Sequence, residues 1–244
     1  SGTPVISNYS EGIINLLGED TVFISESEDD TRKHIEYLLS DEMNWWRASL
    51  KGLRKVIKHH TYEARLNLIL TTIGLVQNEI PLYKFGVVSK VKNMEEVKTL
   101  LRMSKSQYYT NFNISMITHG DRIDNSQHES IKSLFAPIEV KILHIADDHL
   151  EEKILSDSDT KYMAFFHVEN HYGPNYLNDY ADALKFSNPS IMGKAAYFHL
   201  LPGQHLQISD KGLEYKYVSS IRNSTSVHRK SDLDPAKIRN YMND

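Results

Sequence analysis

The segment from Phe165 to His171, Phe-Phe-His-Val-Glu-Asn-His, concentrates groups that can bind a metal ion or a proton behind an apolar run. His167, Glu169 and His171 alternate, and side chains two positions apart share one face of an extended strand. Imidazole and carboxylate groups suit Mn, Zn or Fe. Three in-line residues rarely close a metal site, so the other interpretation is a solvated strand end with one histidine bonded to the backbone.

Asp121 is a second candidate for chemistry. It ends the run Phe-Asn-Ile-Ser-Met-Ile-Thr-His-Gly-Asp, and a carboxylate at a strand end could contact a ribose or the edge of a base. The alternative is an ordinary N-cap or turn aspartate. The other polar groups expected at strand ends are Lys90, Asn93, His119, Asp147 and Asp148.

The elements that must position these residues alternate from Phe85 onward. Strands are expected over residues 85–91, 112–121, 138–147, 161–170 and 190–200, and helices over residues 93–107, 125–135, 148–159 and 174–187. A hairpin is expected over residues 205–220, turning at Asp210-Lys211-Gly212. The alternation predicts an α/β fold, with a mostly parallel sheet and helices on both faces.

The first 78 residues form a separate pattern of strand, helix, strand and three helices. The strands are expected over residues 3–7 and 21–25, and Ser27 with Asp30 makes a capping-box pattern before the second helix. Two strands do not make a stable open sheet alone, so this part is expected to be the end of a larger domain. The sequence therefore predicts two domains, residues 1–78 and 79–244.

The composition excludes several classes. The net charge is -4 and the pI is about 6.3, which gives no general electrostatic case for nucleic acid. The chain has no cysteine, so it forms no disulfide, and this usage fits a cytoplasmic protein. The longest apolar run, residues 66–76, is too short to span a bilayer. The chain begins without Met or a charged leader, as expected of a segment inside a longer protein.

The stretch from Tyr172 to Phe198 resembles the bacterial family 2 glycosyltransferases of the GT-A fold. Those enzymes commonly carry a run of aspartates directly before a Tyr-Gly-Pro-Asn-Tyr-Leu helix start, and a strand containing Gly-Lys-Ala-Ala-Tyr follows. The likeness extends more loosely over residues 85–232. It implies a fold of the nucleotide-diphospho-sugar transferase type.

In that family the aspartate run holds Mn or Mg against a diphosphate, a task for hard oxygen ligands. This chain has residues 167–171 at those positions. The resemblance implies that Glu169 and Asn170 bind the nucleotide sugar, with Glu169 and His171 as metal ligands. It also implies that Asp121 contacts the nucleoside.

The opening residues, Ser-Gly-Thr-Pro-Val-Ile-Ser-Asn-Tyr-Ser-Glu-Gly-Ile, are similar to the donor-side motif of GT-B glycosyltransferases, particularly the CgeB-like group. The resemblance continues to residue 78 and implies the C-terminal end of a Rossmann-like donor-binding domain. In that family the loop after the Thr-Pro-Val strand approaches the phosphates of the nucleotide sugar. The residues implied at the phosphates are Ser7, Ser10, Glu11 and Gly12.

Both resemblances together imply a fragment of a bacterial glycosyltransferase, which transfers a sugar from a nucleotide-sugar donor to a cell-envelope or other glycan acceptor. Peripheral association with a membrane stays open, and no catalytic residue is assigned. One alternative is a catalytically degenerate GT-A-like module that binds glycan or scaffolds a partner transferase domain. A second is a metal hydrolase that uses His167, Glu169 and His171.

Overall fold

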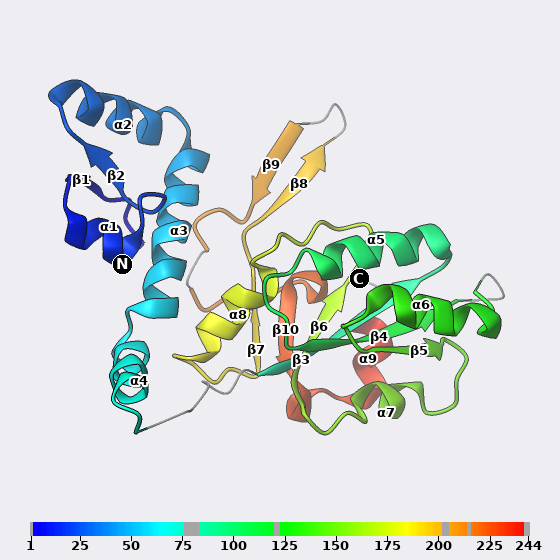
Figure 1. Ribbon diagram of the computed structural model, residues 1–244. Helices are drawn as coiled ribbons and strands as arrows, with labels where there is room; N and C mark the ends of the chain where they lie inside the picture. The colour runs from blue at the N-terminus through cyan, green and yellow to red at the C-terminus, as the bar shows by residue number, and fades with distance from the viewer. Residues whose placement is uncertain (1, 76–82, 120–122, 202–204, 214–215, 242–244) are drawn as a thin grey trace. The chain divides into compact units, whose positions relative to one another are not determined.

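The computed structural model describes residues 2–75, 83–119, 123–201, 205–213 and 216–241. Contacts divide the chain into two compact units, which are called unit 1 (residues 1–80) and unit 2 (residues 81–244). The division lies two residues from the predicted boundary between residues 78 and 79. Figure 1 shows the elements of each unit.

Unit 1 has the predicted order of strand, helix, strand and three helices. Its strands pair in parallel, with Ile6 opposite Phe23 and Asn8 opposite Ser25. The strands are β1 (Ile6–Asn8) and β2 (Phe23–Ser25), and the helices are α1 (Glu11–Leu17), α2 (Glu28–Ser40), α3 (Glu42–His59) and α4 (Tyr62–Thr72). Because both strands run the same way, the loops into α1 and α2 leave the same edge of this small sheet.

Each helix of unit 1 begins at a side chain that accepts a backbone N–H. The predicted pairing of Ser27 with Asp30 is present at the start of α2, since the Ser27 Oγ accepts the Asp30 N–H at 3.1 Å and donates to the Asp30 Oδ2 at 2.8 Å. Ser10 caps α1 more loosely, at 3.5 Å from the nitrogen of Ile13. Asp41 and Thr61 cap α3 and α4 in the same way. Such caps each stabilise a helix by about 1 kcal/mol and fix where the chain turns from strand to helix.

Unit 2 is built on a six-stranded sheet in the order β5-β4-β3-β6-β10-β7. The four strands from β5 to β6 are parallel, and β10 is antiparallel to both of its neighbours. The strands are β3 (Lys84–Val91), β4 (Phe112–Thr118), β5 (Val140–His144), β6 (Thr160–Phe166), β7 (Ile191–Gly193) and β10 (Ser226–Arg229). The predicted α/β fold with a mostly parallel sheet is therefore confirmed.

Helices cover both faces of this sheet, as predicted (Figure 1). The strand β3 shows the alternation, since Val87 and Val91 join one apolar core while Val88 joins the other. The first core lies against α5 (Met94–Lys105), α6 (His128–Phe135) and α8 (Tyr176–Leu184), and the second against α7 (Leu150–Leu155) and α9 (Ile238–Tyr241). Short 3-10 turns lie at Asn125–Gln127, Asn223–Thr225, Lys230–Asp232 and Pro235–Lys237.

Two predictions about the last third of the chain are wrong. The expected strand over residues 190–200 is broken, because β7 ends at Gly193 and a new strand, β8 (Tyr197–Leu201), pairs with β9 (His205–Ser209) outside the main sheet. The expected hairpin turn at Asp210-Lys211-Gly212 follows β9 instead of joining two strands. Asp210 and Gly212 have positive φ, at 55° and 89°, which makes a tight turn but not that hairpin.

Close packing at the end of β7 requires a glycine at position 193. A Cβ on Gly193 would lie 2.2 Å from Ile221 Cδ1 and 2.6 Å from the carbonyl oxygen of Thr225. The neighbouring backbone therefore approaches β7 too closely for any side chain. The Lys194 N–H donates to the Thr225 carbonyl oxygen at 2.8 Å, which continues the register of β7 with β10 by one residue before the chain leaves the sheet.

Candidate functional site

The loops after β3 and β6 border the candidate site of unit 2. From β3 the chain passes through α5 to β4 on one side of β3, whereas β6 pairs with β3 on its other side. The strand order therefore reverses between β3 and β6. In open α/β sheets, ligands bind outside the carboxyl ends of the strands at such a reversal. The site is therefore expected where residues 92–93 and 167–175 leave the sheet.

The segment from His167 to His171 is a turn and not the end of a strand. The strand β6 ends at Phe166, and the Asn170 N–H donates to the carbonyl oxygen of His167 at 2.9 Å. The prediction that His167, Glu169 and His171 share one strand face is therefore wrong. The turn forms because the hydroxyl of the buried Tyr172 accepts the backbone N–H of His167. In a continued strand, a carbonyl oxygen of a neighbouring strand would accept that N–H.

The hydroxyl of Tyr172 is the centre of this turn. It accepts the His167 N–H at 3.0 Å and the Asn170 Nδ2 at 3.4 Å, and it lies 2.9 Å from the Ser224 carbonyl oxygen, to which it donates. The ring is 3% exposed and stacks on Phe166 with ring centroids 4.1 Å apart. Burial raises the pKa of the Tyr172 hydroxyl, so it stays protonated and keeps its donor.

Gln107 fixes the other half of the loop. Its Nε2 donates to the Gly173 carbonyl oxygen at 3.0 Å, and its Oε1 accepts the Leu177 N–H at 3.2 Å. The Tyr108 N–H donates to the Pro174 carbonyl oxygen at 2.8 Å. These bonds hold the start of α8 against the end of α5. Gln107 gave no signal in the sequence, because a glutamine after a helix is ordinary until its partners are known.

Glu169, Asn170 and His171 are all exposed at the tip of the turn. Within the described ranges, no three His, Asp or Glu residues are grouped so that they could hold a metal ion. Glu169 and His171 alone would leave most of the coordination sphere of Mn or Mg to other donors. The assignment of Glu169 and His171 as metal ligands stays a prediction.

The remaining strand-end residues of unit 2 have different surroundings. Asn93 caps α5 by accepting the N–H groups of Glu95 and Glu96, each at 3.0 Å, so its role is structural. The Asp147 Oδ2 accepts the His144 N–H at 3.0 Å and fixes the turn after β5. His119 is exposed directly after β4. Asp121, the predicted nucleoside contact, lies outside the described residues.

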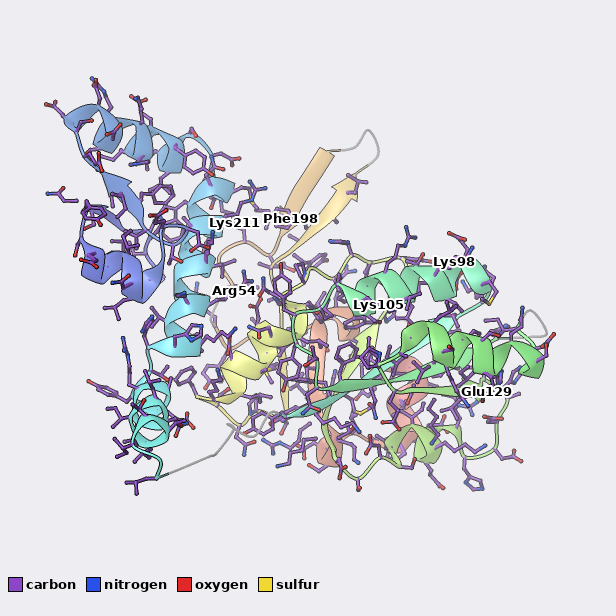
Figure 2. All side chains as sticks on the ribbon, in the orientation of Figure 1. Arg54, Lys98, Lys105, Glu129, Phe198 and Lys211 are labelled. Atoms are coloured by element: carbon purple, nitrogen blue, oxygen red, sulfur yellow. The ribbon has the colours of Figure 1, made fainter. Side chains whose placement is uncertain are left out.

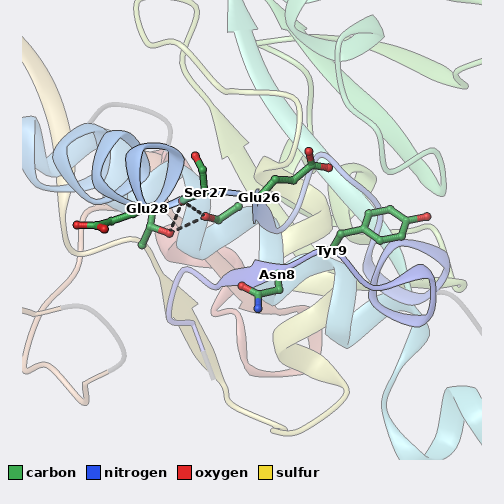
Figure 3. A pocket seen from close by; sticks show the side chains of 7 residues that line it. Asn8, Tyr9, Glu26, Ser27 and Glu28 are labelled. Atoms are coloured by element: carbon green, nitrogen blue, oxygen red, sulfur yellow. Dashed lines mark hydrogen bonds between the residues drawn. The ribbon is translucent and has the colours of Figure 1, made fainter.

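An open hollow of about 600 Å³ lies at the carboxyl ends of β1 and β2 in unit 1 (Figure 3). Asn8 ends β1 and Ser25 ends β2, so the hollow occupies the position where open α/β sheets bind ligands. Polar side chains dominate its wall, and none of them is cationic. The lining residues are Asn8, Tyr9, Ser25, Glu26, Ser27, Glu28 and Thr31.

The floor of the hollow is held by hydroxyl groups. The Ser25 Oγ donates to the Ser27 carbonyl oxygen at 2.9 Å and lies 2.5 Å from the Thr31 Oγ1. Glu26 and Glu28 are exposed beside them, so their carboxylates can accept hydrogen bonds from a ligand. An acidic, hydroxyl-rich wall suits a neutral ligand with many hydroxyl groups better than it suits a phosphate.

The residues predicted to meet a donor lie in β1 and at the start of α1, and not in the wall of the hollow. Ser7 donates to the Asn8 carbonyl oxygen at 3.1 Å, and Ser10 caps α1. Glu11 and Gly12 are exposed in the first turn of that helix. The sequence reasoning missed the polar group after β2, residues 25–28. The signal was present, since a Ser-Glu-Ser-Glu run begins at the last residue of the second predicted strand.

Residues 1–71 match a protein family described as glycosyl transferase-like. The resemblance predicted for residues 1–78 is confirmed over the matched residues, which include every residue of the hollow. No curated protein sequence matches the chain. In the part of the chain that the structure describes, no helix is both long and apolar enough to cross a membrane.

Three solved structures of S. aureus TarS, residues 1–349, are similar to the chain: one without a named ligand, one in complex with UDP-GlcNAc and one in complex with UDP. Each has 14% identity and a TM-score of 0.44 over 61% of this chain. The chain covers 47%, 46% and 47% of those chains, which is less than half of their length. Because the TM-score is below 0.5, the likeness carries no argument for what this chain binds.

Proposed function

We propose that the chain comes from a bacterial glycosyltransferase and that unit 1 supplies part of its nucleotide-sugar site. One observation carries this proposal. The polar hollow lies at the carboxyl ends of two parallel strands, within the residues that match the glycosyl transferase-like family. The reaction would transfer the sugar to a cell-envelope or other glycan acceptor, from a donor present in the cytoplasm.

The chemistry of the hollow suits the hydroxyl-bearing parts of such a donor. A sugar or ribose presents several O–H groups, and carboxylates are strong acceptors for them, worth about 1.5–3 kcal/mol for each bond to a charged group. Glu26 and Glu28 supply the carboxylates, and Asn8 supplies an amide. In this proposal the phosphates lie beyond the acidic wall, near Ser7 of β1 and near the start of α1, where Ser10, Glu11 and Gly12 lie.

The proposal predicts that Asn8→Ala and Glu26→Ala each weaken nucleotide-sugar binding at least tenfold. Each change removes a hydrogen-bonding group from the wall of the hollow without touching the apolar core. Titration calorimetry with a panel of UDP-, GDP- and CDP-sugars measures the effect. Glu36→Ala is the matched control, since Glu36 is exposed on the same helix as Glu28 and does not line the hollow. Equal losses in Glu36→Ala and Glu26→Ala would contradict the proposal.

For unit 2 we propose a GT-A-like role, in which Glu169 and Asn170 contact the diphosphate, Asp121 contacts the nucleoside and a divalent cation binds beside Glu169 and His171. The position of the turn supports this assignment, since residues 167–171 follow β6 at the point where the strand order changes direction. When bound, Mn or Mg would neutralise the charge that develops on the diphosphate.

The metal assignment predicts that Mn tightens nucleotide-sugar binding to the intact chain and that Glu169→Ala abolishes this dependence. Calorimetry with and without Mn measures both quantities. Glu139→Ala is the control, because Glu139 is an exposed carboxylate at the opposite end of the strands. If Mn tightens binding to Glu169→Ala as much as to the unaltered chain, Glu169 is not a metal ligand.

A second candidate function is a non-catalytic module in unit 2 that binds glycan or scaffolds a partner transferase domain. The observation that favours it is the turn itself, where Glu169 is the only acidic residue in the segment from His167 to His171. Retained glycan binding by a chain that binds no nucleotide sugar at any Mn concentration would favour this candidate over the first.

A further inference from the structure

The helix α3 carries its cationic residues in one row. Five of the eight cationic residues of unit 1 lie between positions 47 and 58, and no acidic residue lies among them, although unit 1 has twelve acidic residues. At about 100° per residue, the five fall within roughly 100° of the helix circumference. The residues of this cationic row are Arg47, Lys51, Arg54, Lys55 and Lys58.

Most of the charge of the cationic row is not neutralised by neighbours. The Lys51 Nζ lies 2.9 Å from the Asp20 Oδ2, and this ion pair is itself exposed. Arg47, Lys55 and Lys58 make no hydrogen bond or ion pair with any residue that the structure describes. Like charges on one helix face repel one another, and an anionic surface that meets them relieves this repulsion.

The helix α4 is apolar and carries its charged groups at one end. Glu63 and Arg65 lie in its first turn, and residues 66–72 contain no charged side chain. None of the eleven residues of α4, all of which the structure describes, is buried. An apolar helix is normally covered by a protein core or by lipid, so this exposed helix is expected to have a partner.

Four large apolar side chains form a row on α4. Their spacing of four, three and four residues places them within about 60° of the helix circumference. They are between 55% and 98% exposed. The residues of this apolar row are Tyr62, Leu66, Ile69 and Ile73, of which Ile73 is the C-cap of the helix.

The junction between the two helices is fixed by His60. The Arg65 Nη2 donates to the His60 Nδ1 at 2.9 Å, so the His60 Nε2 carries the proton and donates to the Leu16 carbonyl oxygen at 2.8 Å. Thr61 caps α4 by accepting the Ala64 N–H at 3.2 Å. The helix α4 therefore follows α3 directly and in a fixed direction (Figure 1).

The two rows together indicate the kind of partner. Cationic side chains beside an uncharged apolar helix are typical of segments that lie on anionic lipid bilayers. A second copy of the chain fits less well, because a symmetric interface would bring two cationic rows together. A soluble polyanion would meet the cationic row but would leave the apolar row in water.

We propose that α3 and α4 form a docking site for the surface of an anionic lipid bilayer. The cationic row binds the phosphate groups of the lipid headgroups, and the apolar row enters the boundary between the headgroups and the acyl chains. Stable attachment to a bilayer generally needs two such signals, because each alone gives only weak and reversible binding. The proposal does not rest on the proposed function.

The first test is co-sedimentation of the whole chain with vesicles of phosphatidylglycerol and phosphatidylcholine in equal parts. Binding is expected to be at least tenfold tighter than to vesicles of phosphatidylcholine alone, and to weaken as the salt concentration rises. The triple variant Arg47→Gln, Lys55→Gln, Lys58→Gln is expected to bind the anionic vesicles at least tenfold more weakly. Glutamine keeps the helix propensity of the replaced residues, so α3 remains intact.

A matched control for charge exists on α5. Lys98, Arg102 and Lys105 lie on one face of that helix and are exposed, but Glu95 pairs with Lys98 at 3.4 Å. Figure 2 labels Arg54 of the cationic row and Lys98 and Lys105 of this control helix. The triple glutamine variant of α5 is expected to change the affinity for anionic vesicles by less than threefold.

The second test probes the apolar row at a single site, which the absence of cysteine from the chain allows. Ile69→Cys carrying an environment-sensitive fluorophore is expected to show blue-shifted and at least twofold brighter emission when anionic vesicles are added. Leu134→Cys with the same fluorophore is the control, because Leu134 is an exposed apolar residue of unit 2, and its emission is expected to stay unchanged. The double variant Leu66→Gln, Ile69→Gln is expected to bind the vesicles at least tenfold more weakly.

Four results would overturn the proposal. The first is an equal loss in the α3 and α5 triple variants, and the second is equal binding to vesicles with and without phosphatidylglycerol. The third is a fluorophore at position 69 that stays in water while the chain binds the vesicles. The fourth is a shift of its emission with rising chain concentration and no vesicles, which would assign the apolar row to a second copy. Asn8→Ala is expected to bind vesicles normally, so failure of the donor proposal is distinguishable from failure of this one.

Discussion

Replacing Tyr172 with phenylalanine is expected to destabilise unit 2 by about 1–3 kcal/mol, because the part-buried His167 N–H and the Ser224 carbonyl oxygen then lose their bonds to the Tyr172 hydroxyl. Replacing it with alanine is expected to cost about 3–5 kcal/mol, since the change also removes a ring that stacks on Phe166 and meets Tyr176 edge-on at 4.7 Å. Chemical denaturation of unit 2 measures both values.

Hydrogen exchange gives the more specific readout for Tyr172. In the Phe variant, the amide of His167 is expected to exchange faster by at least tenfold, while amides in the middle of β6 change less. Tyr217→Phe is the control, because Tyr217 is fully exposed and lies in the same unit. If Tyr172→Phe leaves the exchange of the His167 amide unchanged, then the hydroxyl does not hold the turn.

Acidification is expected to destabilise unit 2 through His228. Its ring is 4% exposed, lies between Phe165 and Tyr241 and bonds to the Ser226 Oγ at 2.8 Å. Burial lowers the pKa of His228 from 6.5 to about 4. Between these values the unfolded chain binds the proton more readily, so the free energy of unfolding falls as the pH falls from 6.5 to 4, by about 3 kcal/mol in total.

The variant His228→Phe is expected to flatten this pH dependence. The new ring enters apolar surroundings, and the Ser226 Oγ keeps its bond to the Asn223 carbonyl oxygen at 3.1 Å. Denaturant midpoints measured from pH 7 to pH 4 give the slope, with the exposed His171→Gln as the control. An unchanged slope in His228→Phe would exclude His228 as the group responsible.

Below pH 4 Asp157 adds a further dependence of stability on pH. Burial raises the pKa of Asp157, but the hydrogen bond and charge of Lys84, 2.9 Å away, outweigh it and bring the pKa to about 2. Because the pKa of this carboxyl group is lower in the folded chain, its charge stabilises the fold at pH values above its ordinary pKa of 3.8. This stabilisation is lost as the pH falls toward 2. The losses from His228 and Asp157 therefore occur in successive pH windows.

The order of elements was predictable because it depends on local patterns. The alternation of apolar runs and amphipathic helices after Phe85 predicted a mostly parallel sheet, and the Ser27–Asp30 pattern predicted the start of α2. Both signals lie within a few residues of the features that they determine. The strand end at Phe166 depends instead on Tyr172 and on the Ser224 carbonyl oxygen, 52 residues further along the chain.

The candidate sites were predictable only in part, for the same reason. The loop after β1 was predicted from the opening motif, whereas the hollow also needs residues 25–28, which β2 brings beside that loop through its parallel register. The metal prediction assumed an extended strand at His167 to His171, and the side-chain bond of Tyr172 makes that segment a turn. Single-residue contacts of this kind leave no periodic pattern in a sequence.

The central claim is that the hollow in unit 1 binds part of a nucleotide sugar. Photo-crosslinking the intact chain to a nucleotide sugar that carries a photoreactive group on the sugar, followed by peptide mapping, tests it most directly. Labelled peptides are expected to contain residues 8–9 or 25–31, and Asn8→Ala is expected to reduce the labelling. Saturable labelling confined to unit 2, or labelling that unlabelled nucleotide sugar does not compete away, would contradict the claim.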